Sequence, residues 1–443
     1  MHDDVLIGID IGSSGTKALA YDRAGVVVAA RTVPTPTRRS DGGLDFPVLD
    51  VLAAAEQVLA EVVATVGPVA GVGIASMGEV GTILTDRQLA DLHFPAWYDD
   101  RGADVVAALE ASYGRRELAT VTGGHARATS TIAKLGWLAA HRGCPPGTFL
   151  GVAGALAWRL TGAVTQEAGL ASTSGAFDPV GLRYLPALWN AAGLRSVTPP
   201  GVEPAGTGKP AGATLARTLG LRPSCPVVIA GHDHPVAAVG TGAAPGDVVD
   251  SVGTSEGLLV AMSREQLAKA AGPGPLVADG FTIETWPGTA DLVVMAEGLR
   301  PGLAMQTLLE ESTTSRAALD AAAPPPGIAP DLDRSESLAL ERGELGKLRC
   351  DPLTWASVID HYARLAADQE AALRADSAAA GRTVLTGGGT RSTRWMFAKH
   401  WFGAQEPVIS DITETVTRGG AAIVGAALGW WPDAAAMPGT GSS

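Results

Sequence analysis

The sequence has little cysteine, few aromatic residues and a shortage of basic side chains. Its three cysteines are too few and too scattered for a zinc framework or a disulfide scaffold, which favours a reduced setting. Lysine and arginine together number 33 against 46 aspartate and glutamate residues, so the net charge is −13. This excess of acid disfavours a broad nucleic-acid or anionic-membrane surface, since both partners bind basic faces. A small local pocket for an anionic nucleotide stays compatible with it.

Long apolar runs are also missing from the sequence. None reaches the roughly 20 residues of a membrane span. The acidic start of the chain lacks the basic stretch and apolar run of a secretory signal. The sequence is nevertheless 46% hydrophobic and 18% charged, which predicts large buried cores. We therefore expect a cytoplasmic protein of two or three domains, since domains run to about 100–200 residues.

Short apolar runs that end in glycine-rich turns recur along the chain. Three predicted strands open the sequence and are joined by tight turns: residues 5–9, 16–21 and 26–30. Apolar residues at helical period then predict a helix over residues 51–66. The same order of elements returns in weaker form after the Pro- and Gly-rich residues 198–212. We therefore predict two α/β halves of related design, residues 1–225 and 226–443, with a surface loop over residues 321–347.

A carboxylate and a glycine-rich turn stand together at the end of the first predicted strand, in the sequence DIGSSGTK. Small residues there let successive backbone N–H groups surround an anion. The candidates for this contact are Gly12, Ser13, Ser14, Thr16 and Lys17. Asp10 would repel a phosphate unless a cation lay between them, so it is a candidate Mg²⁺ ligand, acting through water. A plain hairpin turn with a solvated aspartate accounts equally well for the same residues.

Two further glycine loops follow predicted strands in the second half. The sequence DSVGTSEG contains Gly253 and Thr254, and TGGGTRS contains Gly387, Gly388, Gly389 and Ser392 before a predicted helix. A helix N-terminus carries partial positive charge and favours anions. None of the loops is a P-loop, and no GxGxxG follows the first strand. Three such loops, each closing a strand, together favour phosphate binding.

The sequence VIAGHDHP places Asp233 between His232 and His234, after an apolar run. Imidazole and carboxylate groups are common metal ligands. Adjacent residues point in diverging directions on a strand or a helix, so one tripeptide cannot surround a single ion. The remaining histidines lack a paired spacing such as HExxH. The tripeptide is therefore not predicted to be a metal site.

Taken in order, these segments resemble the FGGY carbohydrate kinases from residue 5 to about 429. IGIDIGSSGTKALAYD and DSVGTSE resemble the two phosphate motifs of that family, and VLTGGGTRSTRWMFAKHWFG its adenosine motif. WYDDR, KLGWL and WRLTG match further family motifs. The resemblance implies an α/β fold of two ribonuclease-H-like domains flanking a catalytic cleft, as in actin and hexokinase. It also implies a kinase that uses ATP and Mg²⁺.

The resemblance assigns roles to individual residues. Asp233 matches the catalytic base, and the N-terminus of the following helix should keep its carboxylate ionised. The residues implied to bind the substrate are Glu79, Trp97, Asp99, Arg101, His232 and Asp233. Other roles stay open, since Trp97 would equally suit the core and Arg101 would equally pair with Asp99. His232 and His234 would serve as hydrogen-bonding neighbours, substrate contacts or packing residues.

The sequence departs from the family pattern in two places, and both concern the substrate. SMGEVG, residues 76–81, replaces the GQMHG of xylulose kinase-like members, and residues 324–351 are abbreviated. The expected substrate is therefore a small sugar or polyol, either a ketose or an alditol, and a homodimer stays open. Two alternatives remain: a non-catalytic actin-like or chaperone-like ATP-binding protein, and a regulatory paralogue that binds ATP and sugar. Asp233 and WYDDR favour the kinase.

Overall fold

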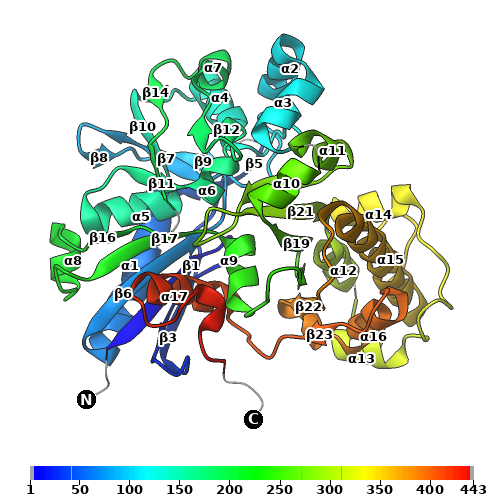
Figure 1. Ribbon diagram of the computed structural model, residues 1–443. Coiled ribbons are helices and arrows are strands. Elements are labelled where there is room, and N and C mark those ends of the chain that lie inside the picture. The colour runs from blue at the N-terminus through cyan, green and yellow to red at the C-terminus, as the bar shows by residue number, and fades with distance from the viewer. Residues whose placement is uncertain (1–3, 41, 205, 271, 311, 440–443) are drawn as a thin grey trace. The chain divides into compact units, whose positions relative to one another are not determined.

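The computed structural model describes residues 4–40, 42–204, 206–270, 272–310 and 312–439. The chain forms two compact α/β units (Figure 1). The first unit contains residues 1–242, 263–293 and 414–443, and the second contains residues 243–262 and 294–413. None of the helices in the described ranges is long and apolar enough to cross a lipid bilayer.

A six-stranded sheet forms the centre of the first unit. Its strands, in order, are β16 (Gly208–Pro210), β17 (Pro226–His232), β6 (Val69–Ser76), β1 (Val5–Ile11), β2 (Gly15–Tyr21) and β3 (Val27–Pro34). β1, β6 and β17 are parallel, whereas β2 and β3 return antiparallel. Ser76 pairs with Ile11 on one side and with His232 on the other. The carboxyl ends of the three parallel strands therefore lie side by side.

Helices cover both faces of this sheet, as the alternation of apolar residues along β1 requires. Ile7 and Ile9 share a core with α1 (Val48–Val66), which also packs against α5 (Val152–Thr161). Leu6 faces the other way, into a core with α17 (Thr415–Ala427). α17 also packs against α9 (Asp233–Gly240), and Figure 1 shows these two helices together over the blue strands from the start of the chain.

Glycine permits the close approach of α17 to the sheet. A Cβ atom on Gly8 would lie 1.7 Å from the carbonyl oxygen of Thr417, and one on Gly73 would lie 2.0 Å from that of Gly420. Neither separation is compatible with a side chain larger than hydrogen. The backbone of α17 therefore rests directly on β1 and β6.

The remaining elements of the first unit are short. The helices are α2 (Ala103–Tyr113), α3 (Arg115–Thr122), α4 (Thr131–His141), α6 (Ala168–Ser172), α7 (Pro186–Ala191), α8 (Thr214–Thr218), α10 (Arg264–Lys269) and α11 (Pro273–Ala278). The strands are β4 (Arg38–Ser40), β5 (Gly43–Pro47), β7 (Gly81–Thr85), β8 (Gln88–Leu89), β9 (His93–Pro95), β10 (Gly147–Gly151), β11 (Thr165–Glu167), β12 (Phe177–Asp178), β13 (Arg183–Tyr184), β14 (Val197–Thr198), β15 (Gly201–Glu203) and β20 (Thr282–Thr285). α11 packs against α3 and β20 against α6, which joins residues 263–293 to this unit.

The second unit is built around strands that neighbour one another in the order β21 (Leu292–Leu299), β19 (Glu256–Met262), β18 (Val248–Val252), β22 (Thr383–Thr386) and β23 (Val408–Ile409). β18 is antiparallel to β19 and parallel to β22. The helices of this unit are α12 (Pro301–Glu310), α13 (Arg316–Ala322), α14 (Arg334–Glu341), α15 (Pro352–Ser377) and α16 (Thr393–Phe402). The two loops at the ends of β18 and β22 contain the glycines singled out in the sequence.

The structure differs from the sequence expectations in two respects. The compact units do not follow the boundary between residues 225 and 226, because α9 and α17 pack on the first sheet. The expected surface loop over residues 321–347 contains the helix α14. This helix is stabilised by a capping box, in which Asp333 and Glu336 satisfy each other's backbone N–H groups.

The contact between Gly8 and Thr417 gives a test of this packing. Gly8→Ala should destabilise the protein by about 1–3 kcal/mol, because the added methyl must displace α17 from the sheet. Gly212→Ala is the matched control, since a Cβ atom there would have its nearest neighbour at 3.9 Å. Urea denaturation of both variants measures the difference. Equal midpoints would show that α17 is not packed as described.

Candidate functional site

The carboxyl ends of β1, β6 and β17 bring several predicted residues of the first unit to one edge of the sheet. Asp10 is the next-to-last residue of β1, and Asp233 begins α9 directly after β17. Glu79 follows β6 by three residues, in the turn before β7. The parallel arrangement therefore collects these three carboxylates, which lie far apart in the sequence.

Asp10 has an oxygen that lacks a partner. Its Oδ1 is buried and receives no hydrogen bond from the described residues. Burial, and then the nearby carboxylate of Asp233, raise the pKa of Asp10 to about 7. The Nζ atom of Lys17 bonds instead to Glu414 Oε2, at 2.8 Å. An unpaired oxygen beside a second carboxylate suits a cation, so Asp10 fits the predicted role of an Mg²⁺ ligand.

The cation would need other ligands besides protein side chains. Among the described residues, no group of three or more histidine, cysteine, aspartate or glutamate side chains could hold a metal ion. Mg²⁺ commonly keeps several waters and binds through only one or two carboxylates. A site in which Asp10 is the single protein carboxylate is compatible with this mode of Mg²⁺ coordination.

The first glycine loop is a tight turn between β1 and β2. The N–H group of Gly12 donates to the carbonyl of Gly15, at 3.2 Å, and the hydroxyl of Thr35 donates to the carbonyl of Gly12, at 2.7 Å. Thr16 is buried, and its hydroxyl lies 3.0 Å from that of Thr35. Ser14 is exposed. Thr16 thus holds the turn from inside, and the serine side of the loop faces solvent.

Asp233 is held by its two histidine neighbours. Its Oδ1 accepts the backbone N–H of His234 at 2.8 Å and lies 3.3 Å from His232 Nε2. The other ring nitrogen, His232 Nδ1, is 3.1 Å from Glu284 Oε2. Burial alone would lower the pKa of His232, but the carboxylates of Glu284, Asp233 and Glu79 raise it to about 10. At neutral pH the ring is therefore an imidazolium.

Sequence reasoning missed two buried carboxylates beside this histidine, Glu284 and Glu167. The side chain of Glu167 caps α6 by accepting the N–H of Leu170 at 3.1 Å, and burial raises the pKa of this residue to about 7. Glu284 lies on β20, in the apolar stretch FTIETW, where it is 1% exposed. A glutamate at a buried strand position was the one available signal, since such a charge must find a partner.

Glu79 occupies a left-handed backbone conformation, with φ of 59°, which is rare for a residue with a side chain. Its N–H donates to Thr173 Oγ1 at 3.1 Å, and its carbonyl accepts the hydroxyl of Thr131 at 3.3 Å. Lys134 is fully buried nearby. Burial lowers its pKa to about 7, although the carboxylates of Glu79 and Asp99 act to raise it. The backbone contacts fix the turn from which Glu79 projects.

The WYDDR segment is tied down by ion pairs. Arg101 Nε donates to Asp99 Oδ1 at 2.7 Å, and its Nη2 donates to Asp45 Oδ1 at 2.5 Å. Burial would raise the pKa of Asp45, but hydrogen bonds from Ser40, Arg142 and Arg101 lower it. The pairing of Arg101 with Asp99, left open by the sequence, is thus present in the structure.

Trp97 has a packing role in this segment. Its ring contacts that of Tyr98 edge to face, with centroids 5.2 Å apart, and it packs against the core of the first unit. The interpretation of Trp97 as a core residue therefore has direct support. The same contacts leave its predicted contact with a substrate untested.

In the second unit, an ion triad fixes the loop that contains Gly253 and Thr254. Lys399 of α16 bonds to Asp250 Oδ2, at 2.7 Å, and to Glu256 Oε1. All three side chains are buried, and the two carboxylates flank the loop on β18 and β19. The two carboxylates raise the pKa of Lys399 although burial opposes the charge. The lysine thus clamps both strands of this hairpin.

The triple-glycine loop ends β22. Gly387 has φ of 95°, and a Cβ atom there would lie 2.5 Å from the carbonyl oxygen of Val252. Gly388 is exposed, and a Cβ atom on it would meet nothing within 4 Å. Ser392 is buried; its hydroxyl donates to Asp320 and accepts the N–H of Trp395. Gly388 is thus open to a ligand, whereas Ser392 caps α16.

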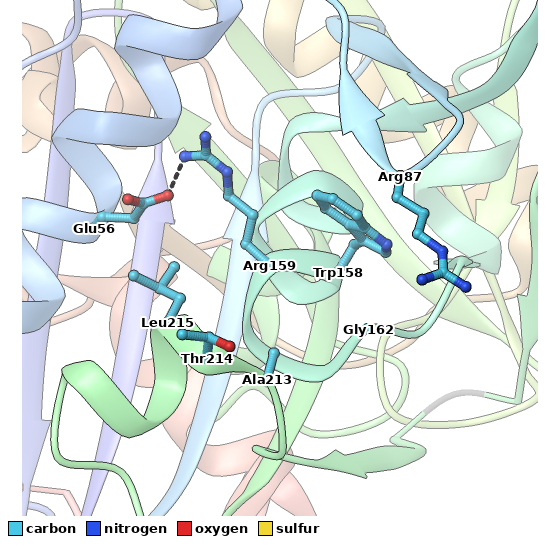
Figure 2. A pocket seen from close by; sticks show the side chains of 8 residues that line it. All are labelled: Glu56, Arg87, Trp158, Arg159, Gly162, Ala213, Thr214 and Leu215. Atoms are coloured by element: carbon cyan, nitrogen blue, oxygen red, sulfur yellow. Dashed lines mark hydrogen bonds and ion pairs between the residues drawn. The ribbon is translucent and has the colours of Figure 1, made fainter.

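A separate cavity of about 590 Å³ lies elsewhere in the first unit, as Figure 2 shows. Its lining includes none of the predicted residues: Glu56, Arg87, Trp158, Arg159, Gly162, Ala213, Thr214 and Leu215. In Figure 2 the side chain of Trp158 lies between those of Arg159 and Arg87, and Arg159 points to Glu56, with which it forms an ion pair. The ion pair of Arg159 with Glu56 therefore lies within the lining of this cavity.

Comparison with known proteins agrees with this fold. Residues 5–240 match the model of the N-terminal domain of the FGGY family of carbohydrate kinases. The chain is 31% identical over 285 residues to an L-fuculokinase of Salmonella typhi, covering 59% of this chain and 57% of that protein. It therefore spans less than two thirds of the length of this curated relative.

Solved structures resemble almost the whole chain. A ligand-bound xylulose kinase from Lactobacillus acidophilus has a TM-score of 0.80 at 16% identity, covering 98% of this chain and 91% of that one. A glycerol kinase from Plasmodium falciparum with ADP has a TM-score of 0.78 at 13% identity, covering 97% and 91%. The chain belongs to the FGGY family of carbohydrate kinases. The predicted fold class, with its actin- and hexokinase-like architecture, is confirmed.

The ion triad of the second unit gives a prediction about stability. Lys399→Met should destabilise the protein by about 3–5 kcal/mol, because it leaves the buried carboxylates of Asp250 and Glu256 without a cation. Lys347→Met, at an exposed position of the same unit, is the control and should change little. Chemical denaturation followed by circular dichroism measures both. A Lys399→Met variant as stable as the control would show that the ion triad does not stabilise the protein.

Proposed function

We propose that this protein is an ATP-dependent kinase that phosphorylates a hydroxyl group of a small sugar or polyol. The observation that carries this proposal is the arrangement of Asp233, whose Oδ1 accepts the N–H of His234 while its side chain stays partly exposed at the start of α9. A carboxylate fixed at a helix N-terminus remains an available base. Family membership and the resemblance to a glycerol kinase with ADP support ATP as the donor.

Phosphoryl transfer to an alcohol requires little covalent chemistry from the protein. In the proposed reaction Asp233 accepts the proton of the substrate hydroxyl as its oxygen attacks the terminal phosphorus of ATP, and ADP leaves. Glu79, held by Thr173 and Thr131, would orient neighbouring sugar hydroxyls through its carboxylate. Asp99 and Arg101 would contribute further contacts to the substrate.

Asp10 would hold Mg²⁺, which neutralises phosphate charge when it is bound. Its unpartnered Oδ1 supports this assignment. In the first unit we propose the backbone of Gly12 to Ser14 as a phosphate contact. In the second unit we propose the backbone of Gly253 and of Gly387 to Gly389 as nucleotide contacts of that unit. The buried hydroxyls of Thr16 and Ser392 contribute by holding their loops in shape.

The substrate is best sought among ketoses and polyols, including L-fuculose because of the L-fuculokinase relative. Purified protein, ATP and Mg²⁺ are incubated with each compound, and the release of ADP is measured. ADP release that depends on one of these compounds supports the kinase. Nucleotide binding without any sugar-dependent release would favour a non-catalytic ATP-binding protein.

Asp233→Asn should lower kcat by about 10²–10⁴-fold and leave the binding of ATP nearly unchanged. The amide keeps the shape of the side chain and can still accept the N–H of His234, but it cannot take up the proton. Asp100→Asn, at an exposed position of WYDDR, is the matched control. Turnover of Asp233→Asn within a few-fold of the wild type would assign the base to another group.

Asp10→Asn should raise the Mg²⁺ concentration needed for half-maximal activity by about 10- to 100-fold, because a charged water-mediated ligand is lost. The melting temperature should not fall, since the buried Oδ1 of Asp10 has no partner to lose. Asp50→Asn, on the exposed side of α1, serves as the control. A lower melting temperature with an unchanged Mg²⁺ requirement would indicate a structural role.

A further inference from the structure

A chain of three side chains leads from the interior of the first unit to Asp233. Glu284, on β20, is buried, and its Oε2 lies 3.1 Å from His232 Nδ1. On the opposite edge of the same ring, His232 Nε2 lies 3.3 Å from Asp233 Oδ1. His232 therefore bridges two carboxylates through its two nitrogens.

We propose that Glu284 and His232 are positioning residues, which hold Oδ1 of Asp233 and leave Oδ2 as the oxygen that accepts the proton of the substrate. This inference rests on the proposed kinase function. It distinguishes the two oxygens of the base: Oδ1 accepts the backbone N–H of His234 and forms the ion pair with the ring of His232. A carboxylate fixed in this way presents one oxygen in a constant direction.

The role of Glu284 is to set the protonation state of the His232 ring. A neutral imidazole carries one N–H group, so it could donate to only one of its two neighbours. The carboxylates that face His232 come from several elements: Glu284 on β20, Asp233 on α9, Glu79 after β6 and Glu167 before α6. Their combined charge keeps the ring doubly protonated although it is buried, so that Nδ1 bonds to Glu284 at 3.1 Å and Nε2 forms an ion pair with Asp233 at 3.3 Å.

The backbone around Glu284 is fixed by its neighbours. The N–H of Ile283 donates to the carbonyl of Gly123 at 2.6 Å, and β20 packs against α6 and α11. The other side of the ring is restrained by His234, whose ring is stacked at a centroid distance of 5.8 Å. The histidine therefore has little freedom to turn away from Asp233.

The test uses Glu284→Gln, which keeps the size of the side chain and removes its charge. With the sugar found for the wild type, kcat should fall by about 10- to 100-fold while the KM for ATP stays the same, because only the base is misplaced. The charge-conserving Glu284→Asp should lose less. Glu265→Gln, at an exposed position of α10, is the control. Unchanged melting temperatures separate this effect from misfolding.

A second measurement does not depend on activity. In protein labelled with ¹⁵N-histidine, the resonances of His232 are identified by their loss in His232→Gln. Both ring nitrogens should be protonated at pH 8 in the wild type, and Glu284→Gln should lose one of these protons at that pH. A neutral ring in the wild type, or a Glu284→Gln variant with unchanged ring and unchanged kcat, would overturn the inference. A wild type without activity on any sugar, but with the protonated ring, would overturn the proposed function instead.

Discussion

The contact between α17 and the first sheet determines where the proposed base lies. Thr417 and Gly420 of α17 rest on Gly8 and Gly73 with no room for a side chain between them. The same helix meets α9 in the same manner, since a Cβ atom on Gly240 would lie 1.8 Å from the carbonyl oxygen of Thr415. α9 begins at Asp233. The direction of this carboxylate therefore depends on a backbone-to-backbone contact with residues nearly two hundred positions further along the chain.

Electrostatics explain why such firm packing is needed. Asp10, Glu167, Glu284 and Asp233 gather at one edge of the sheet, and burial makes the ionisation of Asp10 and Glu167 costly. The positive charge of His232 compensates part of this negative charge through its ion pairs with Asp233 and Glu284. Among the described residues, Oδ1 of Asp10 and Oε1 of Glu167 stay buried without a hydrogen-bond partner.

The local features of this site could be read from the sequence. The strand pattern of β1 and β2, the turn between them and the helix α1 follow from short-range periodicity, and Asp10 and Asp233 stand where strands end. Glu284 could not be assigned, because its partner His232 is 52 positions away and no spacing rule links them. The same holds for Lys399, whose carboxylates are 149 and 143 positions away. The extent of the first unit also depends on such distant contacts, and the boundary expected near residue 225 reflects composition alone.

The discontinuous first unit has a consequence for synthesis on the ribosome. Its central strands β1 and β6 emerge first, but the helix that covers one of their faces consists of residues 415–427. Until that helix emerges, Leu6 and Ala75, which belong to the core completed by α17, lack their cover. Contacts between such distant segments form slowly, and exposed apolar strands invite aggregation. The first unit should therefore need protection from aggregation until residues 415–427 have been translated. The residues of the second unit precede this helix in the sequence, so the second unit can fold earlier.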